Sequence, residues 1–353
     1  MSKKKKPTLE DIAKLANVSK SAVSMILNEK KGVSFLDETI KKVNDAANHL
    51  GYKKIHSKNS INKMLSDKTI LVITPNINSP YYSSLIQSIE QEATRKDLNV
   101  IIFNTYRDKD KEDLALSIVE NSNIYGVIST ITPQSIEKFE EINEKIPVVI
   151  ISDKNNNFDL DTVEISNYEA GVIIAKHMIG LGHKNIAYIS TTLNKANSAR
   201  IMRLDGVQDT YRKYCPNGSV IVKTNDIRPL EELNDINIEH TTGFNLTSEL
   251  LRENTNVTGI IAVNDMVAYG VMESLYNNNY KIPEDYSLCG FDNLFPSKFS
   301  KVSLTTIEHY IINKGHSAVE MLIQRRDLNM SIKSSTKVLY KHKLIVRKST
   351  AKI

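Results

Sequence analysis

Residues 8–28 read TLEDIAKLANVSKSAVSMILN and contain two short helical patterns around a three-residue break. Thr8 can cap a first helix, and Asp11 follows it at the spacing of a capping box. Apolar residues then recur at helical spacing until Asn17–Ser19 interrupts them. The serine that ends this break can cap a second helix over 20–27. The pattern predicts a helix-turn-helix, whose second helix enters the major groove of DNA.

A third helix and a basic charge balance complete this N-terminal region. The third helix is predicted to end at Gly51, and its apolar stripe consists of Ile40, Val43, Ala47 and Leu50. Residues 1–68 contain 15 Lys, no Arg and 7 acidic residues, a balance of +8. The whole chain has a net charge of +5, so the remainder has a balance of −3. A basic head of this kind attracts polyanions such as DNA.

Length and composition predict a globular protein of two or three domains. The chain has 353 residues, of which 41% are hydrophobic and 25% are charged. No apolar run approaches the roughly 20 residues that a membrane helix needs. Four lysines near the N-terminus are not followed by the apolar stretch of a secretory signal. Two cysteines make no disulfide framework and favour a reducing compartment, so we expect a cytoplasmic protein.

From residue 69 onward, short β-branched runs alternate with amphipathic stretches. We expect helices over 84–96 and 167–181, among others. Such alternation indicates parallel sheets with helices on both sides, and ligands bind such sheets at the carboxyl ends of their strands. The predicted strands are 70–74, 100–104, 126–129, 148–152, 185–190, 259–263 and 286–290.

The words TLEDIAKLANVSKSAVSMILN, GVS at 32–34 and LGY at 50–52 resemble the DNA-binding head of the LacI/GalR family of bacterial repressors. The resemblance covers essentially the whole chain. It implies a small all-α helix-turn-helix domain and a two-lobed α/β core with parallel sheets, like a periplasmic binding protein. The implied domains are a head at 1–56, a hinge at 57–68 and a core at 69–353. Lobe 1 would span about 69–166 and 308–333, and lobe 2 about 167–307 and 334–353.

The resemblance also assigns DNA contacts in the head. Lys20, Ser21 and Ala22 would contact bases at the start of the second helix, with Met25 and Asn28 one and two turns on. Three further residues would contact phosphates or set the register of the head on the DNA: Thr8, Ser19 and Ser24. Most family members have Arg in place of Met25. Since Arg contacts guanine through two hydrogen bonds and Met cannot, the base preferred there is left open.

Residues 59–65, NSINKML, resemble the family hinge NAxARxL. In the family this segment folds into a helix on the operator, and two such helices occupy the minor groove. Leu65 would wedge a base step apart, which costs a few kcal/mol per step. A plain flexible linker is the alternative interpretation. The hinge residues expected to contact DNA are Asn59, Ile61, Lys63 and Leu65.

Polar residues after several predicted strands resemble the family's effector site. The segment 75–82 looks like PDxxNPFF, 203–206 like RLxG, and 264–265 like the family's ND. Carboxylates, an amide, an Arg and tyrosine faces suit a polyhydroxylated ligand. Taken singly, an Asp after a strand is more often a helix cap. The expected effector-binding residues are Asn78, Tyr81, Tyr82, Asp153, Arg203, Asn264 and Asp292.

The sequence therefore predicts a homodimeric transcriptional repressor of carbohydrate-utilisation genes that binds a palindromic operator. We expect control by a small molecule, a sugar or sugar derivative, and leave open a protein corepressor or a nucleobase. A sugar-transport binding protein is disfavoured by the basic head. An enzyme is disfavoured because HExxH, GxSxG and GxxxxGK[ST] are absent from the chain. We expect no cofactor, no metal and no membrane partner.

Overall fold

The computed structural model describes residues 7–27, 34–52, 66–154, 159–253, 255–328 and 334–353. The chain forms two compact units, Met1–Met64 and Leu65–Ile353, and each has a hydrophobic core of its own. Within the described residues, no helix is long and apolar enough to cross a membrane.

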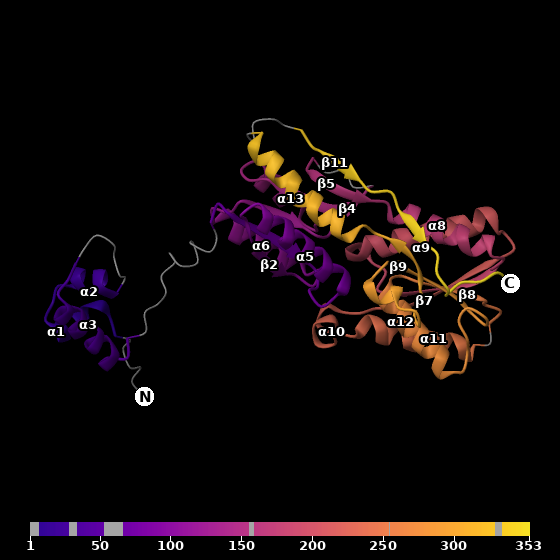
Figure 1. Cartoon of the computed structure of the whole chain (residues 1–353), viewed down its shortest axis with the longest axis horizontal. Helices are drawn as coiled ribbons and strands as arrows, with labels where there is room; N and C mark the ends of the chain where they lie inside the picture. Colours follow the sequence, from indigo (N-terminus) through magenta and orange to yellow (C-terminus); the bar gives the residue numbers. More distant parts are fainter. Residues whose placement is uncertain (1–6, 28–33, 53–65, 155–158, 254, 329–333) are drawn as a thin grey trace. The chain divides into compact units, whose positions relative to one another are not determined.

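The described residues of the first unit form a bundle of three helices, α1 (Leu9–Ala16), α2 (Lys20–Leu27) and α3 (Asp37–His49) (Figure 1). The predicted capping box is present: the Thr8 hydroxyl accepts a hydrogen bond from the Asp11 N–H at 3.3 Å, and the Asp11 carboxylate accepts from the Thr8 N–H at 2.8 Å. Asn17 turns the chain with a φ of 54°. Ser19 caps α2 by accepting from the Ala22 N–H at 3.1 Å. The helix-turn-helix prediction is confirmed.

The second unit has two lobes, and the first contains a sheet of six parallel strands in the order β11-β5-β4-β3-β1-β2. Helices α5 (Pro80–Arg95) and α13 (Ile311–Asp327) pack on one face, and α6 (Lys109–Glu120) and α7 (Ile136–Asn143) pack on the other. The strands are β1 (Thr69–Thr74), β2 (Asn99–Asn104), β3 (Gly126–Ser129), β4 (Val148–Asp153), β5 (Asp161–Ile165) and β11 (Lys337–Leu339).

The second lobe repeats this architecture with the strand order β12-β10-β9-β8-β6-β7, in which only the pairing of β12 with β10 is antiparallel. Helices α8 (Asn167–Gly180) and α9 (Ser198–Tyr214) lie on one face, and α11 (Ile238–Arg252) and α12 (Asp265–Asn277) on the other (Figure 1). A short helix, α10 (Pro229–Asn234), follows β7. The strands are β6 (Asn185–Thr191), β7 (Ser219–Asn225), β8 (Gly259–Ala262), β9 (Ser287–Asp292), β10 (Thr305–Glu308) and β12 (Lys343–Ile345).

In the part of the core that the structure describes, the chain passes between the lobes three times: from β5 to α8, from β10 to α13 and from β11 to β12. From the sequence, we expect the last segment of lobe 2 to begin at residue 334. This boundary is too early, because β11 pairs with β5 in the sheet of the first lobe. Asp161 holds the start of this strand by accepting from the Thr336 N–H at 2.7 Å while it pairs with Arg325 at 2.5 Å. The chain therefore reaches the second lobe only after Leu339.

Parallel sheets with helices on both faces are confirmed, but some predicted elements differ. Helix α5 begins at Pro80 and not at residue 84, because Pro is favourable in the first turn, where its missing N–H costs nothing. Strand β5 was not predicted, since its buried Asp161 and Glu164 break the apolar pattern. Strand β7 was missed because it is a partly exposed edge strand of mixed polarity.

Candidate ligand-binding site

A cavity of about 400 Å³ lies between the two lobes, where strands of both sheets end. The first lobe contributes residues of α5, α13 and the end of β4, and the second contributes residues of α9 and the ends of β8 and β9. Parallel strands place their carboxyl ends at one edge, which explains why the predicted side chains meet. Six of the seven expected effector-binding residues line the cavity: Tyr81, Tyr82, Asp153, Arg203, Asn264 and Asp292.

The seventh expected residue, Asn78, does not line this cavity. Its backbone N–H donates to the side-chain oxygen of Asn76 at 2.8 Å, which is the turn that Asn side chains commonly form. The buried Asn76 amide also donates to Glu232 Oε1 of the second lobe at 3.1 Å. Asn78 therefore shapes the loop between β1 and α5, while Asn76 contacts the opposite lobe.

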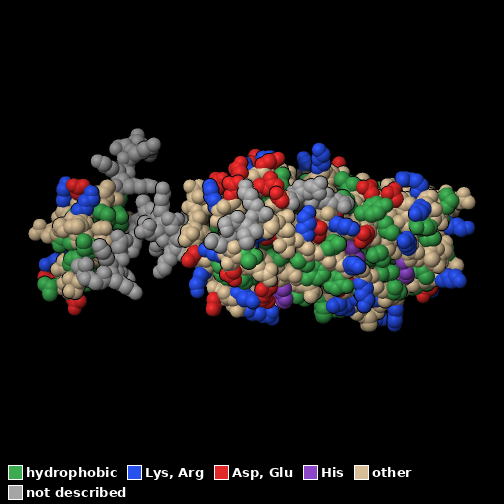
Figure 2. Space-filling view, turned by 90° about the horizontal axis from the view of Figure 1, so that it is seen from above, with side chains coloured by type: hydrophobic (Ala, Val, Ile, Leu, Met, Phe, Trp, Pro, Cys, Tyr) green, Lys and Arg blue, Asp and Glu red, His purple; other side chains and the backbone are tan. Residues whose placement is uncertain are grey.

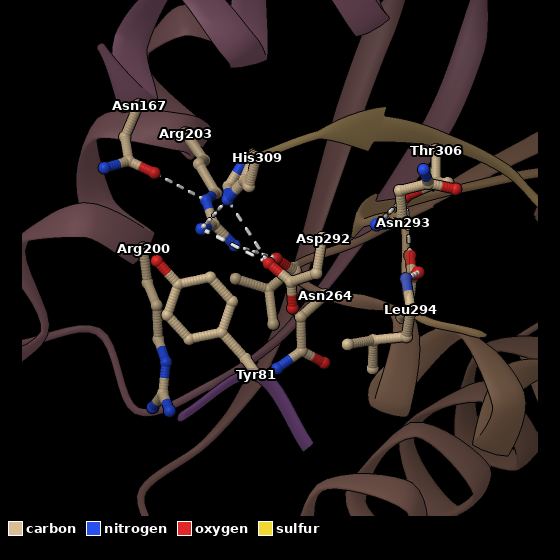
Figure 3. A network of polar contacts seen from close by, with 12 residues as sticks. Tyr81, Asn167, Arg200, Arg203, Asn264, Asp292, Asn293, Leu294, Thr306 and His309 are labelled. Atoms are coloured by element: carbon tan, nitrogen blue, oxygen red, sulfur yellow. Dashed lines mark hydrogen bonds and ion pairs between the residues drawn. The ribbon is translucent and has the colours of Figure 1, made fainter. Parts of the chain in front are cut away.

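Arg203 is at the centre of the polar network in Figure 3. Its Nε donates to Asn167 Oδ1 at 2.8 Å, and its Nη1 donates to the carbonyl of Val263 at 2.6 Å. Its Nη2 lies 3.8 Å from the Asp292 carboxylate and 3.4 Å from His309 Nδ1. These contacts fix the guanidinium, so a ligand meets a preorganised donor rather than a mobile chain.

Asp292, at the end of β9, combines burial with an unusual backbone. Its φ is 110°, a conformation that L-residues rarely adopt and that costs about 1–3 kcal/mol. Burial raises the pKa of its carboxyl well above the usual range, although the nearby Arg203 opposes the shift. His309 lies 3.4 Å from the carboxylate, and burial lowers the pKa of this histidine well below its usual range. Strained backbone of this kind is concentrated at functional sites.

Asp153 acts through Asn167 at the first crossing between the lobes. One carboxylate oxygen accepts from both the backbone N–H and the side-chain amide of Asn167, each at 2.8 Å. Asn167 in turn accepts from Arg203. The helix-cap interpretation of Asp153 and the cavity interpretation therefore both describe its position, since it holds the start of α8 and also lines the cavity.

Two tyrosines in the first turn of α5 form the apolar part of the wall. Tyr81 and Tyr82 pack edge to face with ring centroids 5.0 Å apart. The charges of Asp292 and Arg203 act on the Tyr81 hydroxyl, and all three residues are labelled in Figure 3. Tyr82 faces Arg107, whose guanidinium carbon lies 5.8 Å from the ring centroid. Aromatic faces next to hydrogen-bonding groups suit the alternating apolar and hydroxyl faces of a sugar ring.

Several charged residues of the wall were not predicted from the sequence. Glu232 of α10 crosses between the lobes to Arg107 at 3.1 Å, and Glu239 pairs with Arg200 at 3.4 Å. Asn264 donates to Glu239 at 2.9 Å. The unpredicted lining residues of charged type are Arg107, Lys195, Arg200, Glu232, Glu239 and Lys314.

A recognisable signal existed for only one of these residues. Lys314 lies on the buried stripe of α13, between Ile311 and Ala318, where the helical period calls for an apolar side chain. The two glutamates come from a polar segment with no clear period. In the part of the chain that the structure describes, no group of three or more His, Cys, Asp or Glu side chains could hold a metal ion.

In the head, the described residues that we expect to contact DNA lie on α2 or next to it, apart from Thr8, which caps α1. Val23 and Ile26 are buried against α1 and α3, while Lys20 and Ser21 are exposed at the start of the helix. Ala22, Ser24 and Met25 are half-buried. The remaining predicted DNA contacts, Asn28, Asn59, Ile61, Lys63 and Leu65, lie outside the described residues. On the face of the core in Figure 2, acidic and basic side chains are mixed rather than gathered into one basic surface.

Two family descriptions match the chain. Residues 8–54 match "Bacterial regulatory proteins, lacI family", and residues 67–345 match "Periplasmic binding proteins and sugar binding domain of LacI family". The chain belongs to the LacI family. It is a transcriptional regulator with a DNA-binding helix-turn-helix head and a core of the family's sugar-binding type.

Relatives and solved structures agree with this assignment. The chain is 27% identical to the HTH-type transcriptional repressor PurR of Mannheimia succiniciproducens, over 98% of this chain and 99% of that protein. It is 26% identical to the NTD biosynthesis operon regulator NtdR of Bacillus subtilis, over 98% and 100%. A LacI family regulator of Enterococcus faecalis V583, solved with bound ribose, matches with a TM-score of 0.66 and 26% identity, over 81% of this chain and 100% of that one.

Proposed function

We propose that this protein is a dimeric repressor of carbohydrate-utilisation genes and that a sugar or sugar derivative in the cavity controls its binding to a palindromic operator. One observation carries the proposal: the cavity takes polar side chains from both lobes. A ligand that contacts both lobes favours one arrangement of them over another, since a ligand shifts an equilibrium by its differential affinity. We also propose that the protein works in the cytoplasm, where operator DNA is found.

The chemistry of the wall supports a sugar. Hydroxyl groups both donate and accept, so they match a wall that mixes carboxylates, amides and guanidinium groups. The volume of about 400 Å³ lies in the range of small-molecule sites. The related Enterococcus faecalis regulator was solved with ribose. We propose that Tyr81, Tyr82, Asp153, Arg203, Asn264 and Asp292 form the effector site.

The head supplies the DNA contacts. We propose that Lys20, Ser21, Ala22 and Met25 contact bases, and that Thr8, Ser19 and Ser24 position the head. Effector and operator then affect each other's affinity by the same factor, which for allosteric proteins corresponds to about 1–3 kcal/mol.

The first test is thermal unfolding in the presence of ribose, glucose, their phosphates and acids, and purines. A ligand at about 100 times its dissociation constant adds about 2.7 kcal/mol to the native state. At about 2–4 °C per kcal/mol for a unit of 150–250 residues, this raises the midpoint by about 5–11 °C. The operator is then selected from randomised duplexes, and its affinity is measured with and without the ligand that shifts the midpoint. A sugar that shifts the midpoint and leaves operator affinity unchanged would contradict control by that sugar.

A purine corepressor is a second candidate, favoured by the full-length similarity to the PurR protein of Mannheimia succiniciproducens. The same panel separates the two candidates, because each predicts that a different ligand class stabilises the protein. A panel without any shift would instead favour control by a protein partner. Incubation of the stabilising ligand with the protein, followed by analysis for products, tests our proposal that the protein is not an enzyme.

A further inference from the structure

Lys314 is a buried charge that faces the cavity. It lies on α13, it is fully buried, and it lines the cavity wall. Its Nζ donates to the Tyr81 hydroxyl and lies 4.9 Å from the centre of the Tyr81 ring. Among the described residues, no carboxylate forms an ion pair with this ammonium group.

The other cationic side chains of the wall are differently placed. Arg107, Arg200 and Arg203 each have a carboxylate within 4 Å, at 3.1, 3.4 and 3.8 Å. Lys195 also lines the cavity, but it is exposed, so its ammonium group stays in contact with water. An unpaired ammonium group in a protein interior is unfavourable, because burial removes its water without supplying a counter-charge. Among the described residues, Lys314 is therefore the buried cation of the wall that has no carboxylate within 4 Å.

We propose that Lys314 recognises a negatively charged group of the effector, so that the ligand is a sugar bearing a carboxylate or a phosphate rather than a neutral sugar. This inference rests on the proposed function, because it names the ligand class of the same cavity. The Tyr81 hydroxyl accepts a hydrogen bond from Lys314 and holds the ammonium group at the wall. An anionic oxygen of the ligand would accept a further hydrogen bond from the same ammonium group. A charge-assisted hydrogen bond of this type is about twice as strong as a neutral one.

The charge on Lys314 depends on its surroundings. Burial lowers the pKa of Lys314 to about 7. The negative charges of Asp292 and Glu308 oppose this shift in the pKa, and the positive charge of Arg203 adds to it. Other titratable or charged groups from the surrounding elements lie near Lys314 or share its electrostatic partners. They are Tyr81 on α5, Arg203 on α9, Asp292 at the end of β9, Glu308 at the end of β10, and His309 and His342 in the segments that connect the lobes. An anion binds the protonated lysine, so above pH 7 binding requires uptake of a proton.

The test compares neutral and anionic versions of one sugar by calorimetry with the full chain. The pairs are glucose against gluconate and glucuronate, and ribose and glucose against ribose 5-phosphate and glucose 6-phosphate. At pH 7.0 we expect at least one anionic sugar to bind about tenfold or more tightly than its neutral counterpart. Whether the sugar acids or the sugar phosphates gain more affinity shows whether the ligand bears a carboxylate or a phosphate. From pH 7.0 to 8.5 the affinity for a carboxylate ligand should fall, by up to about tenfold per pH unit.

Two substitutions test whether Lys314 is responsible. Lys314→Met should remove the preference for the anion, so that the neutral and anionic members of a pair bind this variant with affinities within about twofold of each other. Lys314→Arg should keep the preference and remove its pH dependence, because Arg stays protonated. Lys176→Met is the matched control, since Lys176 also lies over a tyrosine ring, 5.5 Å from that of Tyr214, but is exposed on α8.

The empty protein provides a readout without ligand. Lys314 loses its proton more easily when folded than when unfolded, so the stability that it removes is greatest below about pH 7 and shrinks as the pH rises toward 10. Lys314→Met should therefore unfold at a higher temperature than the natural protein at pH 6, and the difference should narrow by pH 9. This result also shows that the variant is folded.

The outcomes separate the two proposals. A neutral sugar that binds as tightly as its acid and phosphate, or a Lys314→Met protein that keeps the anion preference, overturns the inference and leaves the sugar-responsive repressor standing. Loss of neutral and anionic binding together in a folded Lys314→Met protein also overturns it, because Lys314 would then support the cavity in general. A panel that binds nothing at all overturns the proposed sugar effector, and the anionic class with it.

Discussion

At the residue scale, Arg203 links the parts of the candidate site. Its guanidinium donates to Asn167 and to the carbonyl of Val263, and it lies beside Asp292. The six cavity residues predicted from the sequence share a simple feature, because each follows a strand or belongs to a motif of the family. Lys314 and Glu232 lack this feature, so their place in the wall was not predicted.

Replacement of Arg203 by Ala should abolish the response to the effector while operator affinity stays within about twofold. The change also leaves Asn167 and the buried carbonyl of Val263 without their donor, and an unsatisfied buried group costs about 1–3 kcal/mol of stability. Effector binding by calorimetry and operator binding by fluorescence anisotropy check both parts. Arg212→Ala is the control, because Arg212 lies on the same helix in an exposed pair with Asp209. An unchanged effector affinity in Arg203→Ala would show that the pocket is misplaced.

At the scale of elements, the contact between α8 and α9 sets the position of Arg203. Gly171 and Gly206 let the two backbones meet: a Cβ on Gly206 would lie 2.2 Å from the carbonyl oxygen of Tyr168, and one on Gly171 would lie 2.1 Å from that of Arg203. Gly206 of the RLxG motif therefore allows α8 and α9 to pack closely, while Arg203 of the same motif faces the cavity.

Gly206→Ala should force α8 and α9 apart and displace Arg203 from Asn167. We expect a loss of about 1–3 kcal/mol in the free energy of unfolding, as for other overpacked cores. Effector affinity should fall by about tenfold, which corresponds to about 1.4 kcal/mol. Denaturant unfolding and calorimetry measure the two effects.

Gly180→Ala is the matched control for this change. Gly180 ends α8, and a Cβ there meets nothing within 4 Å, so the free energy of unfolding should stay equal or rise by up to about 1 kcal/mol. Equal effects of the two substitutions would contradict the role of the close approach at Gly206.

At the scale of the whole molecule, Glu232 is a contact between the lobes at the cavity. It accepts from Asn76 and Arg107 of the first lobe, each at 3.1 Å. Glu232→Gln should weaken this bridge, because hydrogen bonds to charged groups contribute about 1.5–3 kcal/mol. The effector should then dissociate about tenfold faster, measured by stopped-flow displacement. Glu231→Gln is the control, since its exposed pair with Arg228 stays within the second lobe, and equal rates for both variants would refute the bridge.

The link between head and core gives a prediction that rests on the sequence alone, because Leu65 lies outside the described residues. Leu65→Ala should weaken binding to the selected operator and leave effector binding unchanged, since a smaller side chain wedges a base step less well. Anisotropy with operator and with scrambled DNA measures the specific part. A loss of effector affinity in the same variant would count against a separate hinge.

Much of the fold could be predicted because its signals are local. The capping box of Thr8, the break at Asn17–Ser19 and the apolar strands 70–74 and 148–152 each lie within a few neighbouring residues. The exceptions have local causes as well: β7 is a polar edge strand, and β5 has acidic side chains whose burial depends on partners far away in the chain, as in the pair of Asp161 with Arg325.

The sequence by itself determined the family, the helix-turn-helix head, the alternation of strands and helices, and most residues at the strand ends. Tertiary structure alone decided that Arg107 meets Glu232, 125 positions along the chain, and that Lys314 meets Tyr81, 233 positions away. Such pairs have no local pattern, because they form only when two folded lobes bring distant segments together. For the same reason, only the structure revealed that Lys314 lies in the cavity wall, which is the observation behind the ligand charge that we propose.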